Sequence, residues 1–142
     1  MRDYSIGQIS RDTGVKAPTI RFYEQIGLLP APARSASNRR RYSTADAKRL
    51  RFIRHCRDLG FHVQDIRALL DLASQPQQSC ADADAIADRH LNAVRRRIAQ
   101  LTSLKNELER MVAKCGHGRV ADCRVLESLD DHALCEHHKA QT

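Results

Sequence analysis

The chain has 142 residues and carries a formal net charge of +7, from 24 Lys and Arg residues against 17 Asp and Glu residues. This length leaves little room for a large enzyme core, and the basic balance favours an anionic partner such as nucleic acid. No segment approaches the roughly 20 apolar residues of a membrane span, and the first residues lack the apolar core of a signal peptide, so we expect a cytoplasmic protein.

The first part of the chain predicts two short helices. Ser5 and Gln8 form a capping-box pattern at the start of the first helix, and Gly14 ends it. Pro18 suits the first turn of the second helix, which Gly27 stops. Two short helices joined by a turn that contains glycine predict a helix-turn-helix.

The segment after this pair of helices changes character. Residues 31–42, APARSASNRRRY, are poor in apolar side chains and predict a hairpin or a loop. Ser43 or Thr44 then caps a third helix that runs to about Leu59. Gly60 separates it from a fourth helix over about 63–72, and a linker around Pro76 follows.

One long helix is expected from about Asp82 to Lys114, because this stretch contains neither Gly nor Pro. Its apolar residues follow the seven-residue repeat of a coiled coil, and they are Val94, Leu101, Leu108 and Cys115, with Leu104, Met111 and Ile98 beside them. We interpret this stripe as a contact between two copies of the chain. Beyond it lie the turn CGHGRVADC, a short amphipathic helix with Val125, Leu126 and Leu129, and a polar tail.

Candidate DNA contacts lie on the second helix and on the loop that follows it. A recognition helix needs long hydrogen-bonding side chains on its outer face, and these are Lys16, Thr19, Arg21 and Tyr23. Tyr23 also fits an inward position beside Ile20. Basic residues gather between Arg34 and Arg57, and the loop offers Arg39, Arg40 and Arg41 as cations for phosphate, with Tyr42 as a further donor. Only 4% of the residues are aromatic, so duplex DNA fits better than stacked single strands.

The five cysteines are expected to be thiols, because a reducing compartment disfavours disulfides. Cys115 and Cys123 frame the segment GHGRVAD, whose glycines permit a tight loop around one ion. Two thiolates suit a monovalent ion such as Cu(I), whereas a divalent ion needs more donors. Cys80 offers a third thiolate.

The stretch IGQISRDTGVKAPTIRFYEQIGLLPAPARSASNRRRY resembles the amino-terminal signature of the MerR family of transcription regulators, and the resemblance continues through RDLGFHVQDIRALLDL, the long helix and the cysteine loop. The chain departs from the family at His62, where related chains often carry a capping Ser or Thr. The resemblance implies an all-α fold with a small β wing. It divides the chain into a winged helix-turn-helix over 1–75, a linker and antiparallel dimerisation helix over 76–114, and a metal-binding loop, short helix and tail over 115–142.

The resemblance also implies what the chain does. Family members are homodimers that bind a symmetric operator in a promoter whose spacer is too long for RNA polymerase. Their metal-free dimers repress, and their metal-loaded dimers bend and underwind the DNA, which activates metal efflux or resistance genes. The chain is then expected to be a regulator and not an enzyme.

The position of Cys80 bears on the metal. It precedes the long helix and Cys115 follows it, so the two lie on the order of 50 Å apart in one chain at about 1.5 Å per residue. In an antiparallel dimer they meet across the subunits. Members that sense monovalent ions resemble this chain in the loop but lack a cysteine at position 80, so its presence favours Zn(II), Cd(II) or Pb(II), with His117 as the fourth ligand that Zn(II) prefers. A Cu(I) or Hg(II) sensor of the same family is the alternative.

The remaining cysteines and histidines have weaker interpretations. A second, looser metal site is a candidate, formed by His90, Cys135, His137 and His138, and a polar tail without a site fits equally well. Cys56 is expected in the core, while His55, His62 and His132 are expected to face solvent.

Two other functional classes fit the cysteines alone. One is an enzyme in which Zn(II) activates water, and the other is a cytosolic metal buffer. The chain has no HExxH motif and no evident general base beside the cysteines. Neither class explains the basic loop and the helix-turn-helix.

Overall fold

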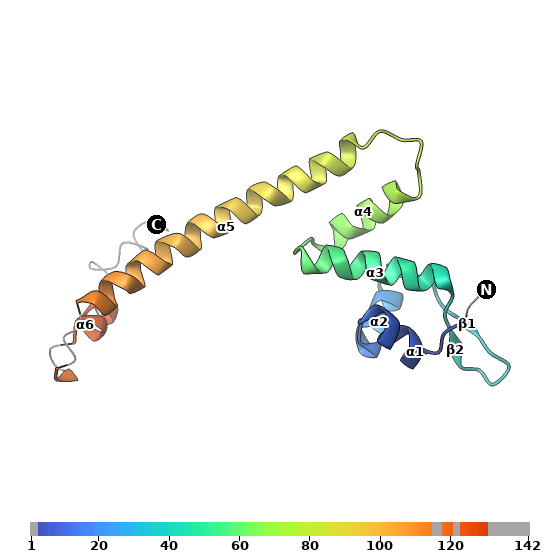
Figure 1. Ribbon diagram of the computed structural model, residues 1–142, viewed down its shortest axis with the longest axis horizontal. Coiled ribbons are helices and arrows are strands. Elements are labelled where there is room, and N and C mark those ends of the chain that lie inside the picture. Colours follow the sequence, from blue (N-terminus) through green and yellow to red (C-terminus); the bar gives the residue numbers. More distant parts are fainter. Residues whose placement is uncertain (1–2, 115–117, 121–122, 131–142) are drawn as a thin grey trace. The chain divides into compact units, whose positions relative to one another are not determined.

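The computed structural model describes residues 3–114, 118–120 and 123–130 (Figure 1). The chain forms two compact units, Met1–Ile86 and Ala87–Thr142. Its elements are α1 (Ile6–Thr13), α2 (Ala17–Gln25), β1 (Ala33–Arg34), β2 (Arg40–Arg41), α3 (Thr44–Asp58), α4 (Val63–Ala73), α5 (Ala81–Ala113) and α6 (Arg124–Asp130). The predicted fold class, helical with a small β wing, is confirmed.

The predicted boundaries of the helix-turn-helix are confirmed. The Ser5 hydroxyl accepts a hydrogen bond from the Gln8 backbone N–H, and the Gln8 side chain accepts one from the Ser5 backbone N–H, which completes the capping box of α1. Gly14 follows α1 with a φ of 74°, the left-handed conformation that glycine adopts most easily. Pro18 lies in the first turn of α2.

The segment poor in apolar residues is a hairpin. Strands β1 and β2 are antiparallel, with Ala33 opposite Arg41 and Arg34 opposite Arg40. A second pairing extends the base of this hairpin, because the backbone groups of Tyr4 and Tyr42 exchange two hydrogen bonds of 2.8 Å. The amino-terminal segment therefore pairs with the base of the wing, which we define as residues 33–42.

The two helices after the wing begin differently. The Ser43 side chain caps α3 in a capping box with Asp46, so Ser43 and not Thr44 is the cap. His62 precedes α4 and makes no capping hydrogen bond with its side chain, as its departure from the family pattern indicates.

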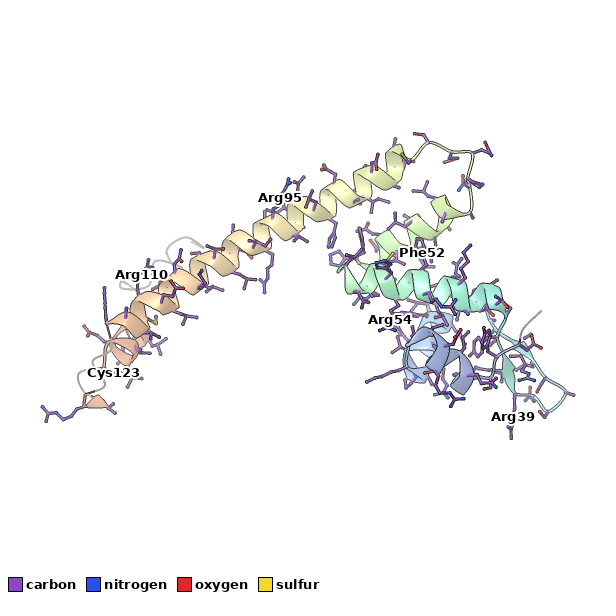
Figure 2. The ribbon with its side chains drawn as sticks, viewed as in Figure 1. Arg39, Phe52, Arg54, Arg95, Arg110 and Cys123 are labelled. Carbon is purple, nitrogen blue, oxygen red and sulfur yellow. The ribbon has the colours of Figure 1, made fainter. Side chains whose placement is uncertain are left out.

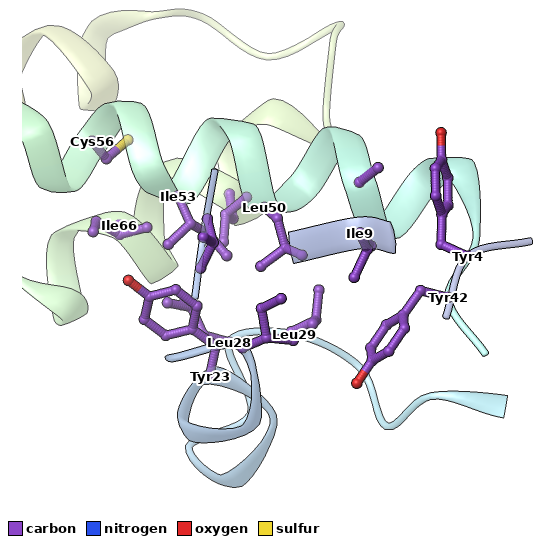
Figure 3. Packing of buried hydrophobic residues seen from close by; sticks show 14 residues of the cluster. Tyr4, Ile9, Tyr23, Leu28, Leu29, Tyr42, Leu50, Ile53, Cys56 and Ile66 are labelled. Atoms are coloured by element: carbon purple, nitrogen blue, oxygen red, sulfur yellow. The ribbon is translucent and has the colours of Figure 1, made fainter. Parts of the chain in front are cut away.

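The core of the first unit lies beneath α3. Figure 3 shows Leu28, Leu29, Leu50 and Ile53 gathered there, with Cys56 of α3 and Ile66 of α4 near the far end of α3. The buried apolar residues are Tyr4, Ile9, Val15, Ile20, Tyr23, Leu28, Leu29, Tyr42, Ala47, Leu50, Ile53, Cys56, Ile66 and Leu70. They come from α1 to α4, from the segments between these helices and from the base of the wing, so one core holds the wing and the helix-turn-helix together.

Part of the basic cluster serves the fold. Arg54 Nη1 donates to the Thr13 carbonyl at 2.9 Å, and Arg49 Nε donates to the Leu28 carbonyl at 2.8 Å. Arg67 Nη2 likewise donates to the Ile26 carbonyl at 2.7 Å. The Thr13 and Ile26 carbonyls lie at the ends of α1 and α2, where the helix provides no partner, and Leu28 lies in the segment after α2. The expectation that clustered arginines serve DNA therefore needs correction, because Arg49 and Arg54 bind backbone carbonyls.

Helix α5 spans 33 residues and carries exposed apolar side chains. Val94, Leu101 and Leu108 of the predicted repeat are exposed, and so are Leu91, Ile98 and Val112. Met111 differs from its predicted place in the stripe, because it is buried within the chain itself. No helix among the described residues is both long and apolar enough to cross a membrane.

Candidate DNA-binding surface and metal-binding residues

The outer face of α2 carries most of the predicted base contacts. Lys16 and Arg21 are exposed, and Thr19 is half-buried. Tyr23 takes the inward alternative, since only 7% of it is exposed, and burial raises the pKa of its hydroxyl. The adjacent Phe22 is 48% exposed. The sequence did not predict Phe22 as a DNA contact. The inward positions of Ile20 and Tyr23 could have indicated that Phe22 lies on the exposed face of α2.

The wing presents two of its three predicted arginines to solvent. Arg39 and Arg41 are exposed, and Arg39 projects from the hairpin away from α3 (Figure 2). Arg40 is half-buried, and its Nε lies 3.4 Å from Glu24 Oε2, an ion pair whose geometry makes no hydrogen bond. Tyr42 is 1% exposed and donates its hydroxyl proton to Glu24. A phosphate contact by Tyr42 would require Glu24 to release this hydroxyl.

An open groove of about 390 Å³ separates the start of α1 from the wing. Ser5, Ile6 and Gly7 line one side, and Arg34, Arg39 and Arg40 line the other. Guanidinium groups beside a groove are well suited to phosphate oxygens, which they bind with paired N–H groups. Arg34 is an addition to the sequence candidates. Arg34 lies beside the groove because it pairs with Arg40 across the hairpin. The strand register that brings these two residues together could not be read from the sequence.

Two of the predicted metal ligands fall within the described residues. Cys80 is exposed and stands directly before α5, where its carbonyl accepts a 2.9 Å hydrogen bond from the Asp84 N–H. Its Sγ lies 3.7 Å from Asp84 Oδ2. Cys123 is half-buried and stands directly before α6, where its carbonyl accepts a 3.0 Å bond from the Glu127 N–H. Both cysteines therefore carry thiols at the start of a helix.

Cys80 also borders a groove whose lining is largely apolar and includes the polar residues Gln75, Gln78 and Ser79. Together with Phe52, Leu69, Leu72 and Ala83, Cys80 lines this groove of about 390 Å³ on the first unit. Across the part of the chain that the structure describes, three or more His, Cys, Asp or Glu side chains do not come together as a metal cluster. Cys115 and His117 lie outside the described residues, so their place in a site stays a prediction.

The other candidates divide between buried and exposed positions. Cys56 is buried as expected, and burial raises the pKa of its thiol. His55 and His62 are exposed as expected, and His90 is half-buried. Cys135, His137 and His138, proposed for a second site, lie outside the described residues, as does His132.

Comparison with known proteins decides the family. Residues 4–73 match the model of the MerR HTH family regulatory protein, and residues 47–111 match the MerR DNA-binding model. The chain is 39% identical to the HTH-type transcriptional regulator HmrR of Rhizobium leguminosarum over 91% of its own length and 99% of that protein. The chain belongs to the MerR family of transcription regulators. This MerR regulator is thus a DNA-binding protein and not an enzyme, as the sequence predicts.

Two further relatives connect this MerR regulator with metals. The heavy metal-dependent transcription regulator 2 of Rhizobium meliloti is 35% identical over 88% of this chain and 85% of that protein. The crystal structure of PbrR691 from Ralstonia metallidurans in complex with lead(II) superposes with a TM-score of 0.76. PbrR691 is 37% identical and the match covers 91% of this chain and 98% of that one. These metal terms describe the two relatives, and regulators of the MerR family bind promoter DNA as homodimers.

Proposed function

We propose that this MerR regulator binds a symmetric promoter operator as a homodimer and responds to a divalent, thiophilic ion, either Zn(II), Cd(II) or Pb(II). Binding of the ion changes how the two DNA-binding units are held, and the distorted operator then activates genes for metal efflux or resistance. RNA polymerase is the expected partner at the promoter, and the cytoplasm is the expected place of action.

The exposed thiol of Cys80 is the observation that carries this proposal. A structural cysteine is usually buried as a small apolar group, as Cys56 is in the core. Cys80 instead presents its sulfur to solvent at the start of α5. A third thiolate at this place supplies the additional negative charge that a divalent ion needs beyond the two thiolates of the loop.

The length of α5 requires two subunits for such a site. A helix of 33 residues measures about 50 Å at 1.5 Å per residue. Cys80 precedes this helix and the loop follows it. The exposed stripe of Val94, Leu101 and Leu108 offers an apolar surface for a second α5, and antiparallel pairing would bring Cys80 of one subunit to the loop of the other.

The donor set fits the three proposed ions to different degrees. Three sulfurs suit Cd(II) and Pb(II), while Zn(II) prefers a fourth ligand, for which His117 is the candidate. The likeness to PbrR691, described in complex with lead(II), supports a thiophilic divalent ion. The site would consist of Cys80 from one subunit with Cys115, Cys123 and His117 from the other.

A Cu(I) or Hg(II) sensor is the second candidate. The pair Cys115 and Cys123 would suffice for an ion that accepts two thiolates in linear coordination. In that case Cys80 would not bind the ion. The two candidates therefore differ in their dependence on Cys80. A second metal site stays a prediction, and its candidate ligands are His90, Cys135, His137 and His138. A metal buffer, the other functional class, would not bind DNA.

The test is a competitive titration of the full-length protein. Zn(II), Cd(II), Pb(II) and Cu(I) are buffered with chelators, and transcription from the regulated promoter is measured with wild type, Cys80→Ser and the matched control Cys56→Ser. We expect the divalent ions to activate wild type and the control, and Cys80→Ser to lose this response. An unchanged divalent response of Cys80→Ser would overturn the proposed ligand set.

A further inference from the structure

Two side chains of the wing interact with one carboxylate of the recognition helix. Tyr42 donates its hydroxyl proton to Glu24, and Arg40 Nε lies 3.4 Å from Glu24 Oε2. Glu24 belongs to α2, three residues after Arg21. The backbone bridge between Tyr4 and Tyr42 ties the wing to the amino-terminal segment. Glu24 is thus a side-chain link between the wing and the recognition helix.

This link is shielded from water. The Glu24 side chain is 9% exposed, and Tyr42 is 1% exposed. Ion pairs and hydrogen bonds to a charged group are stronger under such shielding than at an open surface. Burial and the hydrogen bond to Glu24 raise the pKa of Tyr42, so its hydroxyl keeps the proton that it donates.

We propose that Glu24 is a positioning residue for DNA binding, which fixes the wing on α2 so that Arg39 and Arg41 reach phosphate in a set register with Arg21. The proposal rests on the DNA-binding function of the chain and not on the metal. Glu24 would act through its neighbours, since Arg39 and Arg41 flank Arg40 in the wing and are exposed, as Arg34 on the paired strand also is. Without the carboxylate the wing would sample several positions, and the ordering cost would fall on the binding step.

The sign of the effect separates this role from simple electrostatics. Glutamate is repelled by phosphate, so its neutralisation raises the positive charge of the protein and by itself strengthens DNA binding. Loss of a positioning contact has the opposite effect on the cognate site, where the register matters. Binding to a sequence without the operator depends on charge and much less on register. The two duplexes therefore respond differently to Glu24→Gln.

The experiment uses the full-length protein and two duplexes of equal length and composition. One is the duplex that the wild-type protein selects from a random-sequence pool, and the other is its scrambled version. We expect Glu24→Gln to bind the selected duplex about tenfold more weakly and the scrambled duplex as tightly as wild type or more so. Tyr42→Phe keeps the ring and the ion pair between Arg40 and Glu24. We expect it to change the affinities for the two duplexes in the same directions as Glu24→Gln, but by smaller factors.

A control and a double-mutant cycle complete the test. Asp12→Asn removes one negative charge from the same unit and so breaks the exposed ion pair between Asp12 and Arg51. Neither of these two residues belongs to the wing. We expect it to leave the affinity for the selected duplex unchanged or slightly higher. The affinity lost on Arg39→Ala should be smaller in the Glu24→Gln background than in wild type, because that wing is already misplaced.

The proposal is overturned if Glu24→Gln binds the selected duplex as tightly as wild type, if both duplexes lose affinity equally, or if Arg39→Ala costs the same in both backgrounds. Circular dichroism and thermal unfolding of each variant show whether the fold is intact. Should Glu24→Gln fail to fold, Tyr42→Phe and its own cycle with Arg39→Ala decide the question by the same criteria.

Discussion

Arg54 occupies the space that a side chain at position 14 would need. A Cβ built on Gly14 would lie 1.7 Å from Arg54 Nη1, the same nitrogen that donates to the Thr13 carbonyl at 2.9 Å. Gly14 also has a φ of 74°, where side chains are strained. A larger residue at position 14 would therefore have to displace the Arg54 guanidinium from the end of α1 and adopt a strained φ.

Gly14→Ala should therefore lower the free energy of unfolding by about 2 kcal/mol, from the strained φ and the displaced Arg54. Urea unfolding measures this change. Gly7→Ala is the matched control within α1, because its Cβ would meet nothing nearer than the Ser5 hydroxyl at 4.0 Å. Alanine is a better helix former than glycine and Gly7 lies in the first turn of α1, so the control should be unchanged or gain up to about 0.5 kcal/mol. Equal losses in the two variants would contradict the Arg54 contact as the cause.

Phe22 and Tyr23 should separate binding from stability. Phe22→Ala removes an exposed ring and is expected to change stability by less than about 0.5 kcal/mol, while operator affinity falls about fivefold through lost contact with base or sugar. Tyr23→Ala removes a buried ring and should lower the free energy of unfolding by about 3 kcal/mol. Urea unfolding and fluorescence anisotropy with the selected duplex give both quantities. A stability loss for Phe22→Ala as large as that for Tyr23→Ala would refute the assignment of the faces.

The thiols of Cys56 and Cys80 should differ in reactivity. Burial raises the pKa of Cys56, so at each pH a smaller fraction is the reactive thiolate, and the buried sulfur is also shielded from reagents. In metal-free protein at pH 8, iodoacetamide should modify Cys80 at least about tenfold faster than Cys56, as measured by peptide mass spectrometry. In concentrated urea the two rates should converge. The raised pKa also means that the Cys56 contribution to stability is present below the ordinary thiol pKa and declines as pH rises above it.

Reading DNA and sensing metal should be separable. Arg21→Ala is expected to weaken operator binding by about tenfold, with metal affinity unchanged, because Arg21 is exposed on α2. Cys115→Ser is expected to abolish metal-dependent activation and to leave operator affinity intact. Anisotropy with the operator and chelator competition for metal measure the two properties in each variant. A parallel loss of both properties in either variant would contradict separate surfaces.

Local signals in the sequence predicted most of the elements. The Ser5 and Gln8 capping box, Gly14 and Pro18 define helix ends through contacts within a few residues, and the structure confirms them. The choice between Ser43 and Thr44 needed the structure, because both residue types are common helix caps. The inward position of Tyr23 likewise depended on the packed core.

Roles that depend on distant partners were not visible in the sequence. Arg54 is 41 residues away from the carbonyl that it binds, and Tyr42 is 18 residues away from Glu24. Charge clustering gave the same signal for arginines that bind carbonyls and for arginines that face solvent. Met111 follows the apolar repeat of α5 and is nonetheless buried in its own chain, because a periodic pattern does not specify which surface will cover it.

Mixed dimers test the bridging of two subunits by one ion most directly. Cys80→Ser and Cys115→Ser proteins, carrying different affinity tags, are unfolded together, refolded, and purified as the doubly tagged species. A site that takes Cys80 from one subunit and the loop from the other is intact once in such a dimer. We therefore predict that the mixed dimer binds one Cd(II) with wild-type affinity, whereas each parent homodimer binds none. A mixed dimer that binds Cd(II) no better than its parents would contradict a metal site shared between subunits.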